Sequence, residues 1–163
     1  MSSPTRKRLP HGVPSSVRTA DAVFFITICC DPRGENQICL PEISNRIFES
    51  VAFRNQRGDW WVQFVLLMPD HLHALVSFPP YAEITAVITE WKKFTARTLK
   101  IQWQRDFFDH RLRSDESARD KEEYIRQNPV RAGFVGKAED WPYAWWPTAG
   151  RSGGVEPRRP TNT

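Results

Sequence analysis

Two apolar runs joined by a very short link constrain the fold of this chain most strongly. The first covers residues 60–67 and the second residues 71–78, with Pro69 and Asp70 in the link. A connection this short predicts that the two runs are neighbouring strands of opposite direction. We therefore expect a sheet built around an antiparallel pair.

The second run carries polar side chains on one face only. Because side chains alternate along a strand, His71 and His73 share a face with Leu75 and Ser77. The opposite face is apolar, with Leu72, Ala74, Val76 and Phe78. Two neutral imidazoles side by side suit a divalent cation, and a strand holds them rigidly. On these residues alone, a pair of surface histidines is an equally good interpretation.

The remaining patterns predict an α+β domain. An apolar run at 22–30 is typical of a central strand, and helical spacing indicates helices at 42–57 and 83–102. Gly58 would end the first helix, and a short strand is predicted at 107–112. The order strand, helix, strand, strand, helix, strand is that of a ferredoxin-like antiparallel sheet, the split βαβ arrangement with its helices on one face.

A further helix offers a second pair of polar side chains. Residues 114–128 contain neither Gly nor Pro, and we expect Pro129 to end the helix. Tyr124 and Asn128 are four residues apart and lie on one helical face, with Asp120 one turn earlier. A phenol and a carboxamide are thus presented together, although a helical tyrosine is more often a core or boundary aromatic.

These segments together resemble a known family. The residues His71-Leu72-His73, the run Tyr124-Ile125-Arg126-Gln127-Asn128 and the following Pro-Val-Arg-Ala-Gly are similar to the single-tyrosine HUH transposases, in particular the REP-associated tyrosine transposases of bacteria. The segments 24–27, 107–113 and 141–143 resemble that family in the same order, so the resemblance covers residues 23–146. It implies a ferredoxin-like sheet with the histidines on a central strand and the tyrosine helix appended across it.

The resemblance also implies a chemistry. Tyr124 would attack a DNA phosphodiester and form a covalent 5′-phosphotyrosine, while His71, His73 and Asn128 would hold Mg²⁺ or Mn²⁺. Asparagine is shorter than the glutamine of some relatives, so Asp120 or Glu123 could replace Asn128 as third ligand. The expected partner is single-stranded or hairpin DNA at repeat elements. The alternatives are a protein that binds hairpins without cleaving them and a small metal-dependent hydrolase that uses water as nucleophile.

The charge of the chain is compatible with such a partner. The sequence has 23 Lys plus Arg against 19 Asp plus Glu, a formal net charge of +4 and a pI near 9.2. The expected contacts to the DNA backbone are Arg6, Lys7, Arg8, Lys92, Lys93 and Arg97. Trp60, Trp61 and Trp103 could stack on bases, but we expect them in the core.

Two other polar residues near these motifs have simpler interpretations. Asp70 could orient a histidine or cap the turn. His110 is predicted to be a hydrogen-bonded structural residue.

The chain is expected to contain one catalytic domain at 21–147, between a basic flexible arm at 1–20 and a disordered tail at 148–163. No apolar segment has the length of a membrane span or of a secretory signal, so we expect a soluble, cytoplasmic bacterial protein. The three cysteines have no Cys-x-x-Cys spacing and are predicted to be free thiols. Monomer and homodimer both remain open.

Overall fold

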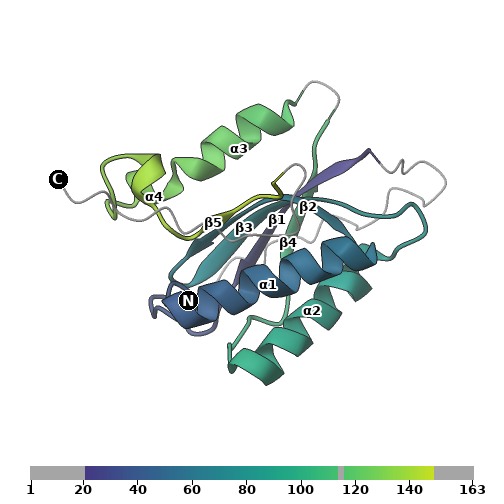
Figure 1. Cartoon of the computed structure of the whole chain (residues 1–163), viewed down its shortest axis with the longest axis horizontal. Helices are drawn as coiled ribbons and strands as arrows, with labels where there is room; N and C mark the ends of the chain where they lie inside the picture. The colour runs from purple at the N-terminus through teal and green to yellow at the C-terminus, as the bar shows by residue number, and fades with distance from the viewer. Residues whose placement is uncertain (1–20, 114–115, 149–163) are drawn as a thin grey trace, which may run out of the picture.

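The computed structural model describes residues 21–113 and 116–148, which form a five-stranded antiparallel sheet with helices on both faces (Figure 1). The strand order is β4-β1-β3-β2-β5. The predicted basic arm, with Arg6, Lys7 and Arg8, and almost all of the predicted tail lie outside the described residues. The division of the chain into arm, domain and tail therefore stays a prediction.

The first seven elements follow in the predicted order, and three short elements come after them. They are β1 (Val23–Cys29), α1 (Pro41–Arg57), β2 (Trp61–Met68), β3 (His71–Ser77), α2 (Ile84–Leu99), β4 (Phe108–Arg111), α3 (Ala118–Arg126), α4 (Asn128–Arg131), the 3-10 helix η2 (Ala138–Asp140) and β5 (Ala144–Trp145). The first six confirm the ferredoxin-like α+β fold. The edge strand β5 was not predicted, because two residues carry no detectable alternation.

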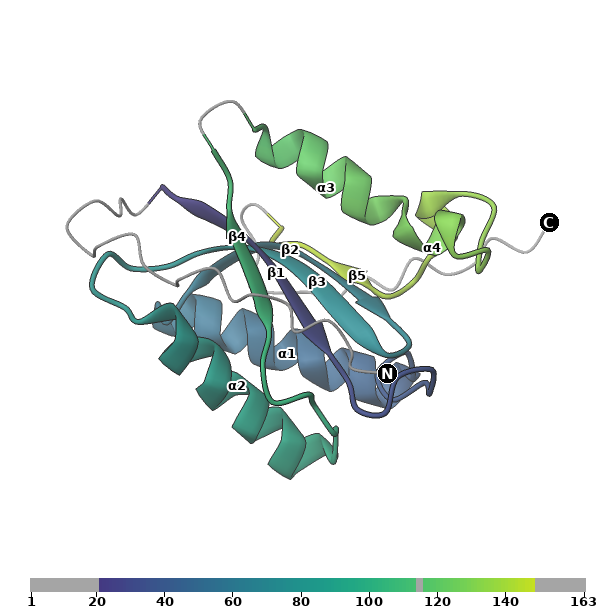
Figure 2. The same cartoon turned by 180° about the vertical axis from the view of Figure 1, so that it is seen from behind.

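One face of the sheet is the hydrophobic core. Helices α1 and α2 pack there, against alternate residues of β1 and β3 such as Ile26, Ile28 and Leu72 (Figure 2). Phe48 of α1 and Trp91 of α2 are almost completely buried. Burial of a large apolar side chain stabilises a fold by roughly 1.5–3 kcal/mol, so this layer supplies most of the stability.

Both long helices end at a residue in the left-handed region. At the end of α1, Gly58 has φ 81°, as predicted from its type. At the end of α2, Lys100 has φ 59°, and the helix ends at Leu99 rather than near residue 102. The earlier end has a packing reason, because the chain must turn to bury Ile101 in the core.

The third helix covers the opposite face of the sheet (Figures 1 and 2). It begins at Ala118, later than predicted, because the Ser117 side chain caps it by accepting from the amide of Asp120. Its buried residue Ile125 packs with Phe64, Leu66, Met68 and Leu75 of the sheet. The tyrosine helix is therefore docked on the face that bears the histidines.

Pro129 does not end the helical segment as predicted. It lies in the first turn of the short helix α4, where a proline is tolerated because its missing N–H has no helical acceptor to lose. The break falls one residue earlier than Asn128, at Gln127. None of the helices in the described part of the chain is both long and apolar enough to cross a membrane.

Candidate active site

His71 and His73 lie side by side on β3, as the alternation predicted. Their ring centres are 4.9 Å apart and the rings are nearly perpendicular, at 77°. In the neighbouring strand β1, Cys29 pairs with His71 and Thr27 with His73. Both histidines are half-buried on the face that α3 covers.

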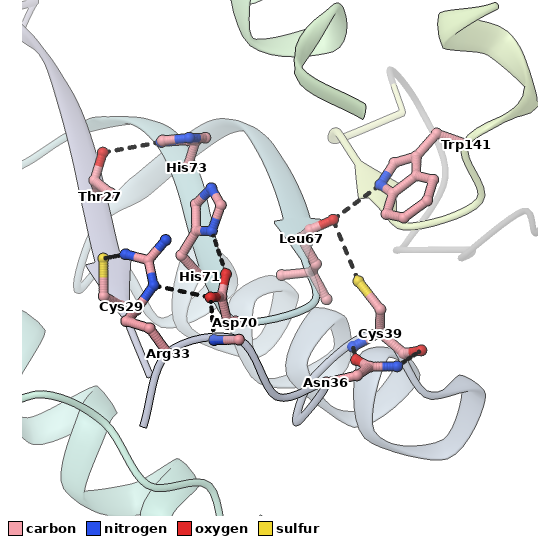
Figure 3. Close-up of polar contacts among 11 residues, drawn as sticks. Thr27, Cys29, Arg33, Asn36, Cys39, Leu67, Asp70, His71, His73 and Trp141 are labelled. Atoms are coloured by element: carbon pink, nitrogen blue, oxygen red, sulfur yellow. Dashed lines mark hydrogen bonds and ion pairs between the residues drawn. The ribbon is translucent and has the colours of Figure 1, made fainter. Parts of the chain in front are cut away.

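A carboxylate fixes the orientation of His71. The Nδ1 of His71 lies 2.8 Å from Oδ1 of Asp70 (Figure 3). Asp70 Oδ2 also accepts from Arg33 Nε at 2.9 Å and from the Gly34 amide at 2.8 Å. Burial opposes ionisation of this carboxyl, but the hydrogen bonds from His71, Gly34 and Arg33 hold its pKa well below the usual range. Asp70 therefore orients His71, which is one of its two predicted roles. Its second oxygen anchors the loop at Arg33 and Gly34, which is not the Pro69–Asp70 turn that it was predicted to cap.

His73 is held by a hydroxyl and an aromatic ring. Its Nδ1 lies 2.9 Å from Thr27 Oγ1, and its ring stacks on Phe25 with centres 5.3 Å apart. Burial, followed by the charges of His71, Arg131 and Arg33, lowers the pKa of His73 to about 3. Burial also lowers the pKa of His71, partly offset by Asp70. Both imidazoles are therefore neutral at pH 7, which is the form that binds metals.

Tyr124 is exposed on α3, the helix that packs over the sheet face of the two histidines. Its exposed fraction is 59 %, although the next residue, Ile125, is buried and anchors the helix. Arg131 Cζ lies 4.3 Å and Lys121 Nζ 5.5 Å from the centre of the phenol ring. Helix α3 contacts both β2 and β3, so the helix that carries Tyr124 lies over the histidine strand.

The side chains of His71, His73 and Asn128 carry the kinds of donor atom that a divalent cation binds. Neither Nε2 atom of the histidine pair has a hydrogen-bond partner within the described residues, and the same is true of the Asn128 carboxamide. Two imidazoles and an amide oxygen are ligands that magnesium or manganese accepts. In this part of the chain, no three His, Cys, Asp or Glu side chains group in a way that could hold a metal. Asp120 and Glu123 therefore gain no support as ligands, and Glu123 instead accepts from Gln127 Nε2 at 2.9 Å.

The structure corrects one predicted DNA contact. Lys92 is only 8 % exposed, and its Nζ donates to the carbonyls of Gln104 at 2.7 Å and Arg105 at 3.0 Å. Its ammonium holds the loop after α2 and is not available to a DNA backbone. Lys93 and Arg97 are exposed, but α2 lies across the sheet from the histidines (Figure 2).

The expectation that the tryptophans lie in the core is confirmed for two of the three. Trp60 is buried in the core and Trp103 packs partly buried against it, but the prediction for Trp61 was wrong, because its side chain is 43 % exposed at the start of β2. His110 Nε2 lies 3.1 Å from Glu116 Oε1, as expected of a structural histidine. The thiols Cys29, Cys30 and Cys39 are free, and two of them are buried.

Sequence reasoning missed three residues of this site. Thr27 belongs to the β1 segment that resembles the family, but only the strand register shows that it faces His73. Arg33 reaches Asp70 across 37 residues, which no local pattern reveals. Arg131 was detectable in principle, because it follows Tyr124 by seven residues, or about two helical turns.

Comparison with known proteins agrees with this geometry. Residues 26–128, more than half of the chain, match the family model described as IS200-like transposase. The chain belongs to this transposase family. It is 31 % identical over 143 residues to a Haemophilus influenzae protein assigned as a REP-associated tyrosine transposase, a match that covers 77 % of this chain and 80 % of the relative.

Two further matches of this IS200-like transposase are also to REP-associated tyrosine transposases. It is 32 % identical over 84 residues to the REP-associated tyrosine transposase of Escherichia coli K12, covering 48 % of this chain and 50 % of that protein. A solved REP-associated tyrosine transposase bound to a REP hairpin superposes with a TM-score of 0.65 at 21 % identity. That match covers 88 % of this chain and 82 % of the solved one, and it shows a shared fold.

Proposed function

We propose that this IS200-like transposase cleaves and rejoins single-stranded DNA next to hairpin elements through a covalent 5′-phosphotyrosine at Tyr124. One observation carries the proposal. An exposed tyrosine stands on a helix that is docked over the same sheet face as two neutral, oriented imidazoles. A protein that only bound DNA would need neither the nucleophile nor the ligands.

The reaction exchanges one phosphodiester bond for another. The Tyr124 oxygen attacks the phosphorus, a bond forms between them, and the bond from phosphorus to the 3′-oxygen breaks. The phenol gives up its proton to water or a nearby base, and the departing 3′-oxygen takes up a proton to become a hydroxyl. Attack by another 3′-hydroxyl on the phosphotyrosine reverses these steps and rejoins the strand, so no nucleotide cofactor is consumed.

His71, His73 and Asn128 would hold Mg²⁺ or Mn²⁺ at the scissile phosphate. A cation bound there polarises the phosphate and neutralises the charge that develops during attack. The protein prepares its ligands in advance, because Asp70 and Thr27 fix the two rings through their Nδ1 atoms. Each Nε2 is left with a free lone pair, provided that Nδ1 carries the proton.

Hairpin DNA is the proposed substrate class for two reasons. A solved relative of the same fold is bound to a REP hairpin. In addition, a tyrosine on a surface helix reaches a backbone phosphate most easily in a flexible, unpaired strand, and the unpaired segment beside a hairpin stem provides one.

An adduct assay tests the proposal. The protein is incubated with MnCl₂ and labelled single-stranded oligonucleotides that contain hairpins, and denaturing gels reveal a covalent protein–DNA species. We expect an adduct with the native chain that is lost in Tyr124→Phe and in the double variant His71→Ala/His73→Ala. The matched control is Tyr81→Phe, because Tyr81 is 87 % exposed and lies outside the site.

Two results would contradict the proposal. Tight hairpin binding without an adduct would indicate a non-cleaving relative. DNA cleavage that persists in Tyr124→Phe would instead indicate a metal-dependent hydrolase with water as nucleophile.

A further inference from the structure

Arg131 lies against the ring of the proposed nucleophile. Its Cζ is 4.3 Å from the centre of the Tyr124 ring, and its Nη2 donates to the Tyr124 carbonyl at 3.0 Å. Arg131 is the last residue of α4, so these contacts span the junction between α3 and α4. The local fold therefore sets the position of the guanidinium relative to the phenol.

The Arg131 guanidinium is accessible, and most of its N–H donors have no partner among the described residues. Arg131 is exposed, and its charge reaches His73 on β3. A guanidinium has five N–H donors, and only the one on the Tyr124 carbonyl is engaged by a described residue. The group thus lies against the tyrosine, and most of its hydrogen-bonding capacity is unused by the described residues.

Charge pairing distinguishes Arg131 from Arg33 and Arg126. Arg33 forms an ion pair with Asp70 at 2.9 Å, and Arg126 with Glu122 at 2.6 Å. Arg131 forms no ion pair with any residue that the structure describes. A cation without a protein counter-ion beside a nucleophile is suited to an anion supplied by the substrate.

We propose that Arg131 is a catalytic residue that binds a non-bridging oxygen of the phosphodiester attacked by Tyr124. The inference rests on the proposed role of Tyr124 as nucleophile. Attack adds negative charge to the phosphate oxygens, and a guanidinium already in place stabilises that charge more than the charge of the ground state. The phosphate stays bonded to the Tyr124 oxygen in the covalent adduct, so Arg131 would hold the same group during cleavage and rejoining.

The test separates reaction rate from DNA binding and folding. Rates of adduct formation at saturating hairpin DNA are compared for the native chain, Arg131→Ala and Arg131→Lys. The matched control is Arg46→Ala, because Arg46 is an exposed arginine of α1 on the other side of the sheet. DNA affinity is measured in the Tyr124→Phe background, and thermal unfolding is followed for every variant.

We expect the rate of Arg131→Ala to fall about 100-fold, with a smaller loss for Arg131→Lys, which keeps the charge without the planar fork. The Arg46→Ala rate should stay within about threefold of the native rate, which is the scale of a remote surface change. Added guanidinium ion should restore part of the Arg131→Ala rate and leave the native rate unchanged. Restoration by a free cation is not expected if Arg131 only stabilises the helix junction.

Two outcomes would overturn the role of Arg131 and leave the proposed function intact. One is an Arg131→Ala rate equal to that of Arg46→Ala. The other is a rate loss that follows the loss of thermal stability and is restored neither by guanidinium nor by Arg131→Lys. By contrast, if the native chain formed no adduct, this result would contradict the assignment of Tyr124 as nucleophile and overturn the proposed function itself.

Discussion

The two faces of the sheet differ in what their side chains are used for. Residues of β1 alternate strictly, with Ile26 and Ile28 at 1 % and 2 % exposure on the helix-covered face and Thr27 half-buried on the other. The first face gains stability by excluding water. The second holds His71 and His73 in fixed orientations through their Nδ1 atoms, and no described residue hydrogen-bonds to their Nε2 atoms. The same strands thus support the fold on one side and the chemistry on the other.

A change on the core face should affect stability far more than chemistry. Trp91→Ala removes a side chain that is 2 % exposed and should lower the free energy of unfolding by about 3–5 kcal/mol. Trp61→Ala, at 43 % exposure, should lower it by less than about 1 kcal/mol. Urea titrations measure both values. The assignment of stability to one face and chemistry to the other would be wrong if Trp91→Ala stopped adduct formation in molecules that are still folded.

A change on the face that bears His71 and His73 should affect the chemistry far more than the stability. Asp70→Asn keeps the shape but removes the charge that orients His71, so adduct formation should slow by about 10- to 100-fold. The Mn²⁺ concentration needed for half-maximal rate should rise. The matched control is Asp59→Asn, since Asp59 also pairs with arginines but lies at the end of α1. Equal effects of the two changes would argue against an orienting role for Asp70.

Acid should reveal the cost of burying His73 in the metal-free protein. Because the folded state lowers the pKa of His73 from about 6.5 to about 3, the unfolded chain binds more protons between these values. Stability should therefore fall as the pH drops through this window, by about 1–2 kcal/mol between pH 7 and pH 5. Urea titrations with EDTA present measure the fall. In His73→Gln the slope should be shallower, and an unchanged slope would show that His73 is not responsible.

The weakest expected effect concerns the attachment of the tyrosine helix. Arg126 Cζ lies 4.4 Å from the Phe64 ring centre and 4.7 Å from that of Trp146, which links α3 to the sheet and the chain beyond β5. Arg126→Met should cost about 1 kcal/mol of local stability. Hydrogen exchange should accelerate in α3 while the amides of β1 and β3 keep their protection. Uniform acceleration across the sheet would show that α3 and the sheet unfold as one unit.

The central sheet could be predicted from the sequence because alternation and helical spacing are local. His71 and His73 share a strand face by periodicity alone, and Tyr124 and Asn128 share a helical face in the same way. The order of the first six elements followed from these patterns. The joining of the two pairs into one site rested on the family resemblance, since no local pattern shows which face of the sheet a later helix covers.

The parts that could not be predicted depend on long-range contacts. Lys92 was predicted to contact the DNA backbone, but its buried ammonium donates instead to the carbonyls of residues 104–106. Arg33 joined the site only because the turn before α1 folds back on Asp70. In both cases the partner is fixed by tertiary packing, and for Lys92 this packing outweighs the preference of a cation for water.

Peptide mapping of the covalent adduct tests the central claim most directly. Trypsin cleavage after Lys121 and Arg126 would release residues 122–126, which contain only one of the three tyrosines of the chain. We predict that mass spectrometry finds the nucleotide on this peptide, linked through a 5′-phosphate to Tyr124. Attachment to Tyr81, Tyr143 or a non-tyrosine residue, or cleaved DNA without any linked peptide, would contradict the assignment of Tyr124 as nucleophile.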